Sequence, residues 1–151
     1  METINNNTTY KFKDIHIGKM IEERWSEKNI NIVRTCNFLK VTELEIKEMF
    51  LLPDMNSQML LRWSKLLEYD FFRIYSQHLI LYAPPSSTEK NTEAKNGALP
   101  VFRKNIYTKE IIDFIMERLN NKEKTKFEIM KEYGIPKSTL YKWIHKYNDK
   151  P

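Results

Sequence analysis

The chain has 151 residues, of which 41% are hydrophobic, so it can build one ordinary domain or two very small ones. Its formal net charge is +5, and its single cysteine, Cys36, excludes an intramolecular disulfide and a cysteine-based metal cluster. The polar, Asn-rich N-terminus predicts no secretory signal, and no apolar run is long enough for a membrane span. We therefore expect a cytoplasmic protein without membrane contact.

The positive charge is concentrated in the last third of the chain. Residues 1–100 contain 13 basic and 13 acidic side chains, whereas residues 101–151 contain 12 basic and 7 acidic ones. A local positive field is the expected footprint of a protein that binds a polyanion. A solvated lysine-rich surface that binds nothing has the same composition, so charge alone does not decide between them.

The sequence as a whole predicts an all-α fold of two small helical modules of helix-turn-helix type, joined by a flexible linker. Glycine is scarce, with 3 residues, and Leu, Ile, Lys and Glu favour helix over sheet. We expect a disordered tail at 1–13 and a five-helix module at 14–83. A linker rich in Pro, Ser and Asn follows at 84–104, and a second helical module at 105–148.

The first module is predicted to contain five short helices. Thr42 and Glu45 have the spacing of a capping box at the start of the third helix. The first predicted helix has Ile17, Ile21 and Trp25 on one face and ends at Asn29. The second runs from Ile32 to Leu39 and the third from Thr42 to Leu51. The fourth runs from Ser57 to a break at Tyr69, and the fifth from Phe71 to about Leu81.

The second module is predicted to contain three helices. Thr108 is expected to cap the first, and Thr125 with Glu128 forms a capping box for the second. Gly134 can adopt the positive φ that a tight turn at the end of the second helix requires. Pro136 then starts a third helix that runs to about Tyr147. The predicted apolar stripe of the first of these helices consists of Ile112, Ile115, Met116 and Leu119.

Apolar residues surround Gly134 at the offsets that lock the two helices of a helix-turn-helix together. They are Ile129, Tyr133, Ile135, Leu140 and Trp143, at −5, −1, +1, +6 and +9. The opposite face of the third helix then points outward, with side chains suited to phosphates and base edges. The predicted DNA-binding residues are Lys137, Ser138, Thr139, Tyr141, Lys142, His145 and Lys146. The alternative is an ordinary helical hairpin with a solvated face.

This segment resembles the DNA-binding helix-turn-helix of insertion-sequence transposases, and especially their small first-frame subunits. The resemblance rests on Tyr133-Gly134-Ile135, Ser138-Thr139-Leu140-Tyr141 and Trp143, and covers about 45 residues. It implies a module that binds double-stranded DNA at element ends. Met130 departs from the pattern, because this family usually has a small residue four positions before the glycine.

Residues 15–82 resemble, more weakly, the five-helix domain of phage repressor and Cro-like regulators. Cys36 falls where that motif has a small residue at the helix crossing, and the apolar positions are filled by Leu39, Val41, Ile46 and Met49. The outward face of the third helix would show Thr42, Glu43, Leu44, Lys47 and Glu48. Because residues 42–50 hold one lysine and three glutamates, phosphates would repel this face.

We therefore expect the first module to contact protein, either a second copy as a homodimer or a catalytic transposase partner. Its segment Trp63 to Tyr82 is rich in apolar and aromatic side chains. Most of these are expected to form the core of the module, and a surplus would form a dimer surface.

The sequence gives no argument for an enzyme, and we expect neither a cofactor nor a metal. His16, His78 and His145 are isolated from other metal-ligating residues in the sequence, and there is no glycine-rich phosphate loop. The favoured function is a sequence-specific DNA-binding subunit of transposase type without its own catalytic domain. Two alternatives stay open, a transcriptional regulator with the same module and a protein-interaction adaptor.

Overall fold

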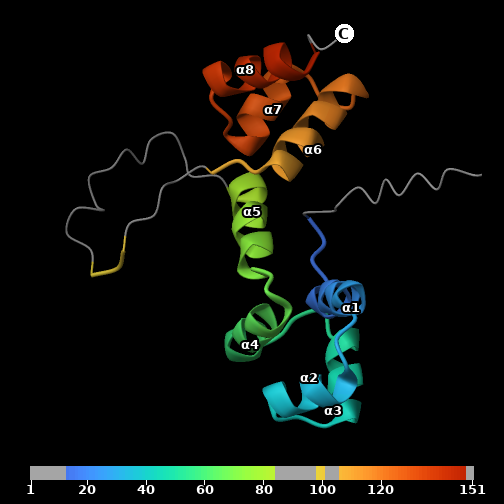
Figure 1. Cartoon of the computed structure of the whole chain (residues 1–151). Helices are drawn as coiled ribbons and strands as arrows, with labels where there is room; N and C mark the ends of the chain where they lie inside the picture. Colours follow the sequence, from blue (N-terminus) through green and yellow to red (C-terminus); the bar gives the residue numbers. More distant parts are fainter. Residues whose placement is uncertain (1–12, 84–97, 101–105, 149–151) are drawn as a thin grey trace, which may run out of the picture. The chain divides into compact units, whose positions relative to one another are not determined.

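The structure, a computed structural model, describes residues 13–83, 98–100 and 106–148 (Figure 1). Nearly all of the predicted tail (1–13) and linker (84–104) lies outside the described residues. Within the described part the chain forms eight helices and no strand, so the prediction of an all-α fold is confirmed. None of the described helices combines the length and the apolar character that a bilayer crossing requires.

Internal contacts divide the chain into two compact units, and the division falls between Ser76 and Gln77. This point lies inside α5 (Phe72–Tyr82), so the first turns of that helix belong to one unit and its end to the other. The two units are described separately below as the N-terminal unit and the C-terminal unit. The module boundaries drawn from the sequence, at 83 and 105, stay predictions.

The N-terminal unit contains four complete helices, α1 (Ile17–Lys28), α2 (Ile32–Leu39), α3 (Glu43–Leu51) and α4 (Ser57–Leu67). Local signals set their ends. Three of the helices end at a residue in the left-handed conformation, and asparagine or threonine side chains accept a hydrogen bond at the start of α2, α3 and α4. The capping box expected for Thr42 and Glu45 is present.

The core of this unit is formed by side chains from all five of its helices. The hydrophobic side chains that are less than a tenth exposed are Ile17, Ile21, Leu39, Ile46, Phe50, Leu60, Trp63, Leu66, Leu67, Phe71 and Ile74. The apolar and aromatic segment Trp63 to Tyr82 therefore contributes mainly to the core, which is the interpretation that the sequence favours. Trp25 is half-buried, and its indole N–H donates to the hydroxyl of the fully buried Thr35 over 2.9 Å. Cys36, expected at the helix crossing, is only half-buried.

The start of α1 packs directly against the end of α3. The backbone N–H groups of Ile17 and Gly18 donate to the carbonyls of Pro53 and Leu52, each over 3.0 Å. A Cβ built on Gly18 would lie 2.4 Å from the carbonyl oxygen of Met49. This approach between two backbones requires a residue without a side chain.

The C-terminal unit contains the end of α5 together with α6 (Lys109–Asn120), α7 (Lys126–Tyr133) and α8 (Lys137–Asn148). Helix α6 is rotated from the predicted orientation. Ile111 and Phe114 are buried, whereas Ile112 and Leu119 of the predicted stripe are only half-buried. The expectation was wrong at those two positions because the apolar residues of α6 extend beyond one stripe, and packing against other helices selects the buried face.

Thr108 stands at the start of α6 as expected, but its side chain does not cap the helix. Its hydroxyl instead accepts a hydrogen bond from the side-chain amide of Gln77 over 3.0 Å. This contact joins the end of α5 to the start of α6 inside the C-terminal unit. Leu81 of α5 is buried, and the ring of Tyr82 lies edge-on to the ring of Tyr133, with centroids 6.3 Å apart.

Candidate nucleic-acid interface

The turn between α7 and α8 has the geometry that the sequence predicts. Helix α7 ends at Tyr133, and Gly134 adopts the left-handed conformation with φ 62° and ψ 26°. Helix α8 begins at Lys137, directly after Pro136, which cannot donate a backbone hydrogen bond inside a helix. The chain is therefore broken at Gly134, and α7 and α8 are separate helices.

The apolar positions around this turn are buried, as expected. The exposed fractions are 0% for Ile129, 2% for Tyr133, 2% for Ile135, 0% for Leu140 and 8% for Trp143. Burial raises the pKa of the Tyr133 phenol to about 12. Since Leu140 and Trp143 fix one side of α8 against α7 and the rest of the unit, the opposite side of α8 must face solvent.

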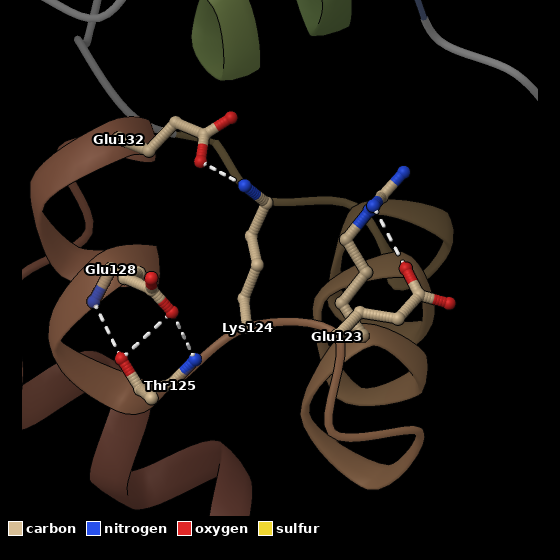
Figure 2. Close-up of polar contacts among 6 residues, drawn as sticks. Glu123, Lys124, Thr125, Glu128 and Glu132 are labelled. Carbon is tan, nitrogen blue, oxygen red and sulfur yellow. Dashed lines mark hydrogen bonds and ion pairs between the residues drawn. The ribbon is translucent and has the colours of Figure 1, made fainter.

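The start of α7 is fixed by a capping box (Figure 2). The backbone N–H of Glu128 donates to the Thr125 hydroxyl over 3.2 Å, and the backbone N–H of Thr125 donates to the Glu128 carboxylate over 2.7 Å. The backbone N–H and the hydroxyl of Thr125 both donate to the Glu128 carboxylate, and these two bonds stabilise its charged form and lower the pKa of Glu128. The first turn of α7 is thereby held in one position relative to the turn that precedes it.

Two cations near this cap already have acidic partners (Figure 2). Arg118 forms an ion pair with Glu123 at 2.9 Å, and Lys124 forms one with Glu132 of α7. Among the described residues, Lys137, Lys142 and Lys146 of α8 have no such acidic partner. The positive charge that is not neutralised by a carboxylate therefore includes all three lysines of α8.

Six of the seven predicted binding residues lie on the solvent-exposed side of α8. They are Lys137, Ser138, Tyr141, Lys142, His145 and Lys146. The seventh, Thr139, is half-buried and lies next to the fully buried Leu140, so it is the least accessible of the set. The exposed side is basic and hydrogen-bonding, and residues 137–148 contain no acidic side chain.

One contributor to this surface was missed from the sequence. Lys126, the first residue of α7, places its Nζ 5.2 Å from the centre of the Tyr141 ring, and the Nζ of Lys137 lies 5.6 Å from the same ring. The phenol is thus flanked by two cations from two helices. Phe127, beside Lys126, is 69% exposed. The spacing within α8 contains no signal for Lys126, because the contact depends on how α7 crosses α8.

The turn between α2 and α3 in the N-terminal unit also has a left-handed residue directly after its first helix, but the exposed surface beside it is different. Lys40 takes the place of Gly134, with φ 59°. The exposed side of α3 carries the residues expected there, and Lys47 forms an ion pair with Glu43 at 2.8 Å. With three glutamates and one lysine in residues 42–50, this surface lacks the uncompensated cations that phosphate binding requires.

The described residues contain no group of three or more His, Cys, Asp or Glu side chains that could hold a metal ion. Comparisons with protein-family models, curated proteins and solved structures find no significant match to this chain.

Proposed function

We propose that the chain is a sequence-specific DNA-binding protein that inserts α8 into the major groove. The observation that supports this most directly is the exposed side of α8, with three lysines, no acidic residue and a firmly buried opposite side. The major groove of B-form DNA is wide enough to admit an α-helix. The lysines would contact phosphates or guanine acceptors, while Ser138 and Tyr141 would contact phosphates or base edges.

The test is binding of the full chain to duplex DNA, after selection of preferred sequences from a random pool. The triple variant Lys137→Ala/Tyr141→Ala/Lys142→Ala should bind the selected duplex at least tenfold more weakly than the unaltered chain, since each contact to a base contributes about 1–3 kcal/mol. Lys109, Lys122 and Lys131 are exposed lysines elsewhere in the same unit, and their triple alanine variant is the matched control. Equal affinity of the two triple variants would reject α8 as the binding helix.

Within this proposal, the chain would be the DNA-binding subunit of a transposition system, with the chemistry performed by another polypeptide. This finer assignment rests on the resemblance of the segment around Gly134 to insertion-sequence transposases. Selected DNA sites that match terminal inverted repeats beside the gene would support it. Sites in promoter regions would instead favour a transcriptional regulator with the same DNA-binding surface.

A protein-interaction adaptor is the second candidate, favoured by the acidic side of α3. An adaptor would show no duplex binding even at low salt, where electrostatic attraction to phosphates is strongest. Binding that weakens steeply as salt rises would reject it in favour of the first proposal.

A further inference from the structure

Four exposed side chains form one stripe along α3, which we call the α3 stripe. It consists of Leu44, Lys47, Glu48 and Leu51, at the spacing i, i+3, i+4 and i+7 that places residues on one helical face. Leu44 is 67% and Leu51 76% exposed, although Ile46 on the other side of the helix is fully buried. Two largely exposed leucines thus flank a lysine and a glutamate.

The α3 stripe is symmetric about the midpoint between Lys47 and Glu48. In an antiparallel pair of α3 helices related by a twofold axis, Leu44 would face Leu51 of the partner subunit. Lys47 would then face Glu48 of the partner subunit, and the axis would repeat both contacts. A parallel pair would instead place Lys47 against the same lysine of the other copy, and like charges at that distance repel.

We propose that α3 mediates homodimerisation, with the α3 stripes of two copies packed antiparallel. The partner is a second copy because the stripe is complementary to itself in both charge and apolar spacing. Its leucines lose water on pairing, which favours association. The ion pair of Lys47 with Glu43 of its own helix, at 2.8 Å, leaves the ammonium available to a second carboxylate.

Helix α3 has only 9 residues, so the contact is smaller than a standard protein interface. We therefore expect a reversible dimer in the micromolar range. A dimer would also carry two copies of α8, which would raise the local concentration of the second DNA contact after the first has formed. The inference does not depend on DNA binding, since it concerns the N-terminal unit alone.

The test is analytical ultracentrifugation of the full chain over a range of concentrations, with charge reversals inside the α3 stripe. Lys47→Glu alone creates two glutamate–glutamate contacts in the antiparallel pair, and Glu48→Lys alone creates two lysine–lysine contacts. Each single variant should dimerise at least tenfold more weakly. The double variant Lys47→Glu/Glu48→Lys should dimerise again, and an equimolar mixture of the two single variants should form a heterodimer.

Lys65→Glu, a reversal of an exposed lysine on α4, is the control and should leave dimerisation unchanged. Leu44→Ser/Leu51→Ser should abolish the dimer, whereas Leu79→Ser, at a leucine that is 58% exposed on α5, should not. Far-ultraviolet circular dichroism checks that each variant keeps its helices. A chain that stays monomeric at hundreds of micromolar would overturn the proposal. Failure of the mixed single variants to associate would also overturn it.

Discussion

The Nζ of Lys126 lies 5.2 Å from the centre of the Tyr141 ring, so the first residue of α7 touches the exposed side of α8. The two residues are distant in sequence, and only the crossing of α7 and α8 brings them together. Lys126 therefore extends the basic surface of α8 onto a second helix and places a cation beside the phenol of Tyr141.

Replacing Lys126 by alanine should weaken DNA binding although the residue lies outside α8. A lysine that contacts phosphate contributes to all sequences about equally, so we expect a loss of roughly 1 kcal/mol on selected and unrelated duplexes alike. The slope of log affinity against log salt concentration should decrease in magnitude by about 1, because one fewer counterion is released on binding. Fluorescence anisotropy at several salt concentrations measures both. Lys131→Ala, at an exposed lysine near the other end of α7, is the control, and an equal loss there would refute a specific role for Lys126.

Gly134→Ala should destabilise the C-terminal unit by about 1–2 kcal/mol, because φ is 62° there and a Cβ disfavours the left-handed conformation. Gly134→Asn should cost less, since asparagine tolerates this conformation better than alanine. Hydrogen exchange of the α7 and α8 amides reports the stability of this unit alone. Identical protection in the two variants would show that backbone conformation is not what selects glycine here.

Gly18→Ala should destabilise the N-terminal unit by about 2–3 kcal/mol or more. The added methyl would lie 2.4 Å from the carbonyl oxygen of Met49 and 2.6 Å from those of Phe50 and Leu52, so the backbone of α1 or α3 must move. Ser26→Ala, at an exposed position of the same helix, is the control for helix propensity. Hydrogen exchange of the α1 and α3 amides should become faster in Gly18→Ala but not in Ser26→Ala. Unchanged exchange in Gly18→Ala would contradict the close approach of the α1 and α3 backbones.

The capping box of α7 should make local stability depend on pH. Hydrogen bonds from Thr125 hold the pKa of Glu128 below its ordinary value in the folded chain. A carboxylate with a lowered folded pKa adds stability that is present above its unfolded pKa, about 4.3, and is lost as pH falls through the folded pKa. Glu128→Gln should therefore reduce the hydrogen-exchange protection of the α7 amides at neutral pH. In this variant the protection should also decrease less as pH is lowered below ~4.5.

Thr125→Ala should remove the other half of the same box and cost about 1 kcal/mol. The box of Thr42 and Glu45, which begins α3, is the internal control because Thr42 lowers the pKa of Glu45 in the same way. Protection of the α3 amides should keep its pH dependence in both α7 variants. If the pH dependence of protection changed as much for the α3 amides as for the α7 amides, the variants would be acting on the whole chain rather than on the α7 cap.

The sequence by itself determined where most helices begin and end. Thr42 with Glu45, Thr125 with Glu128, and Gly134 followed by Pro136 each act within a few residues, through a cap or a fixed φ, and the structure has helix ends at each of them. The five apolar positions around Gly134 were equally predictable, because fixed offsets from a tight turn select one side of each helix.

Only the tertiary structure decided how α6 is rotated, since its apolar residues permit more than one buried face and packing selects Ile111 and Phe114. It likewise gave Thr108 a partner in Gln77 instead of a capping role, and it brought Lys126 to Tyr141. Local hydrogen bonds and backbone angles are encoded within a few residues of one another. A contact between two helices depends on their crossing, which is set by the combined packing of side chains far apart in the sequence.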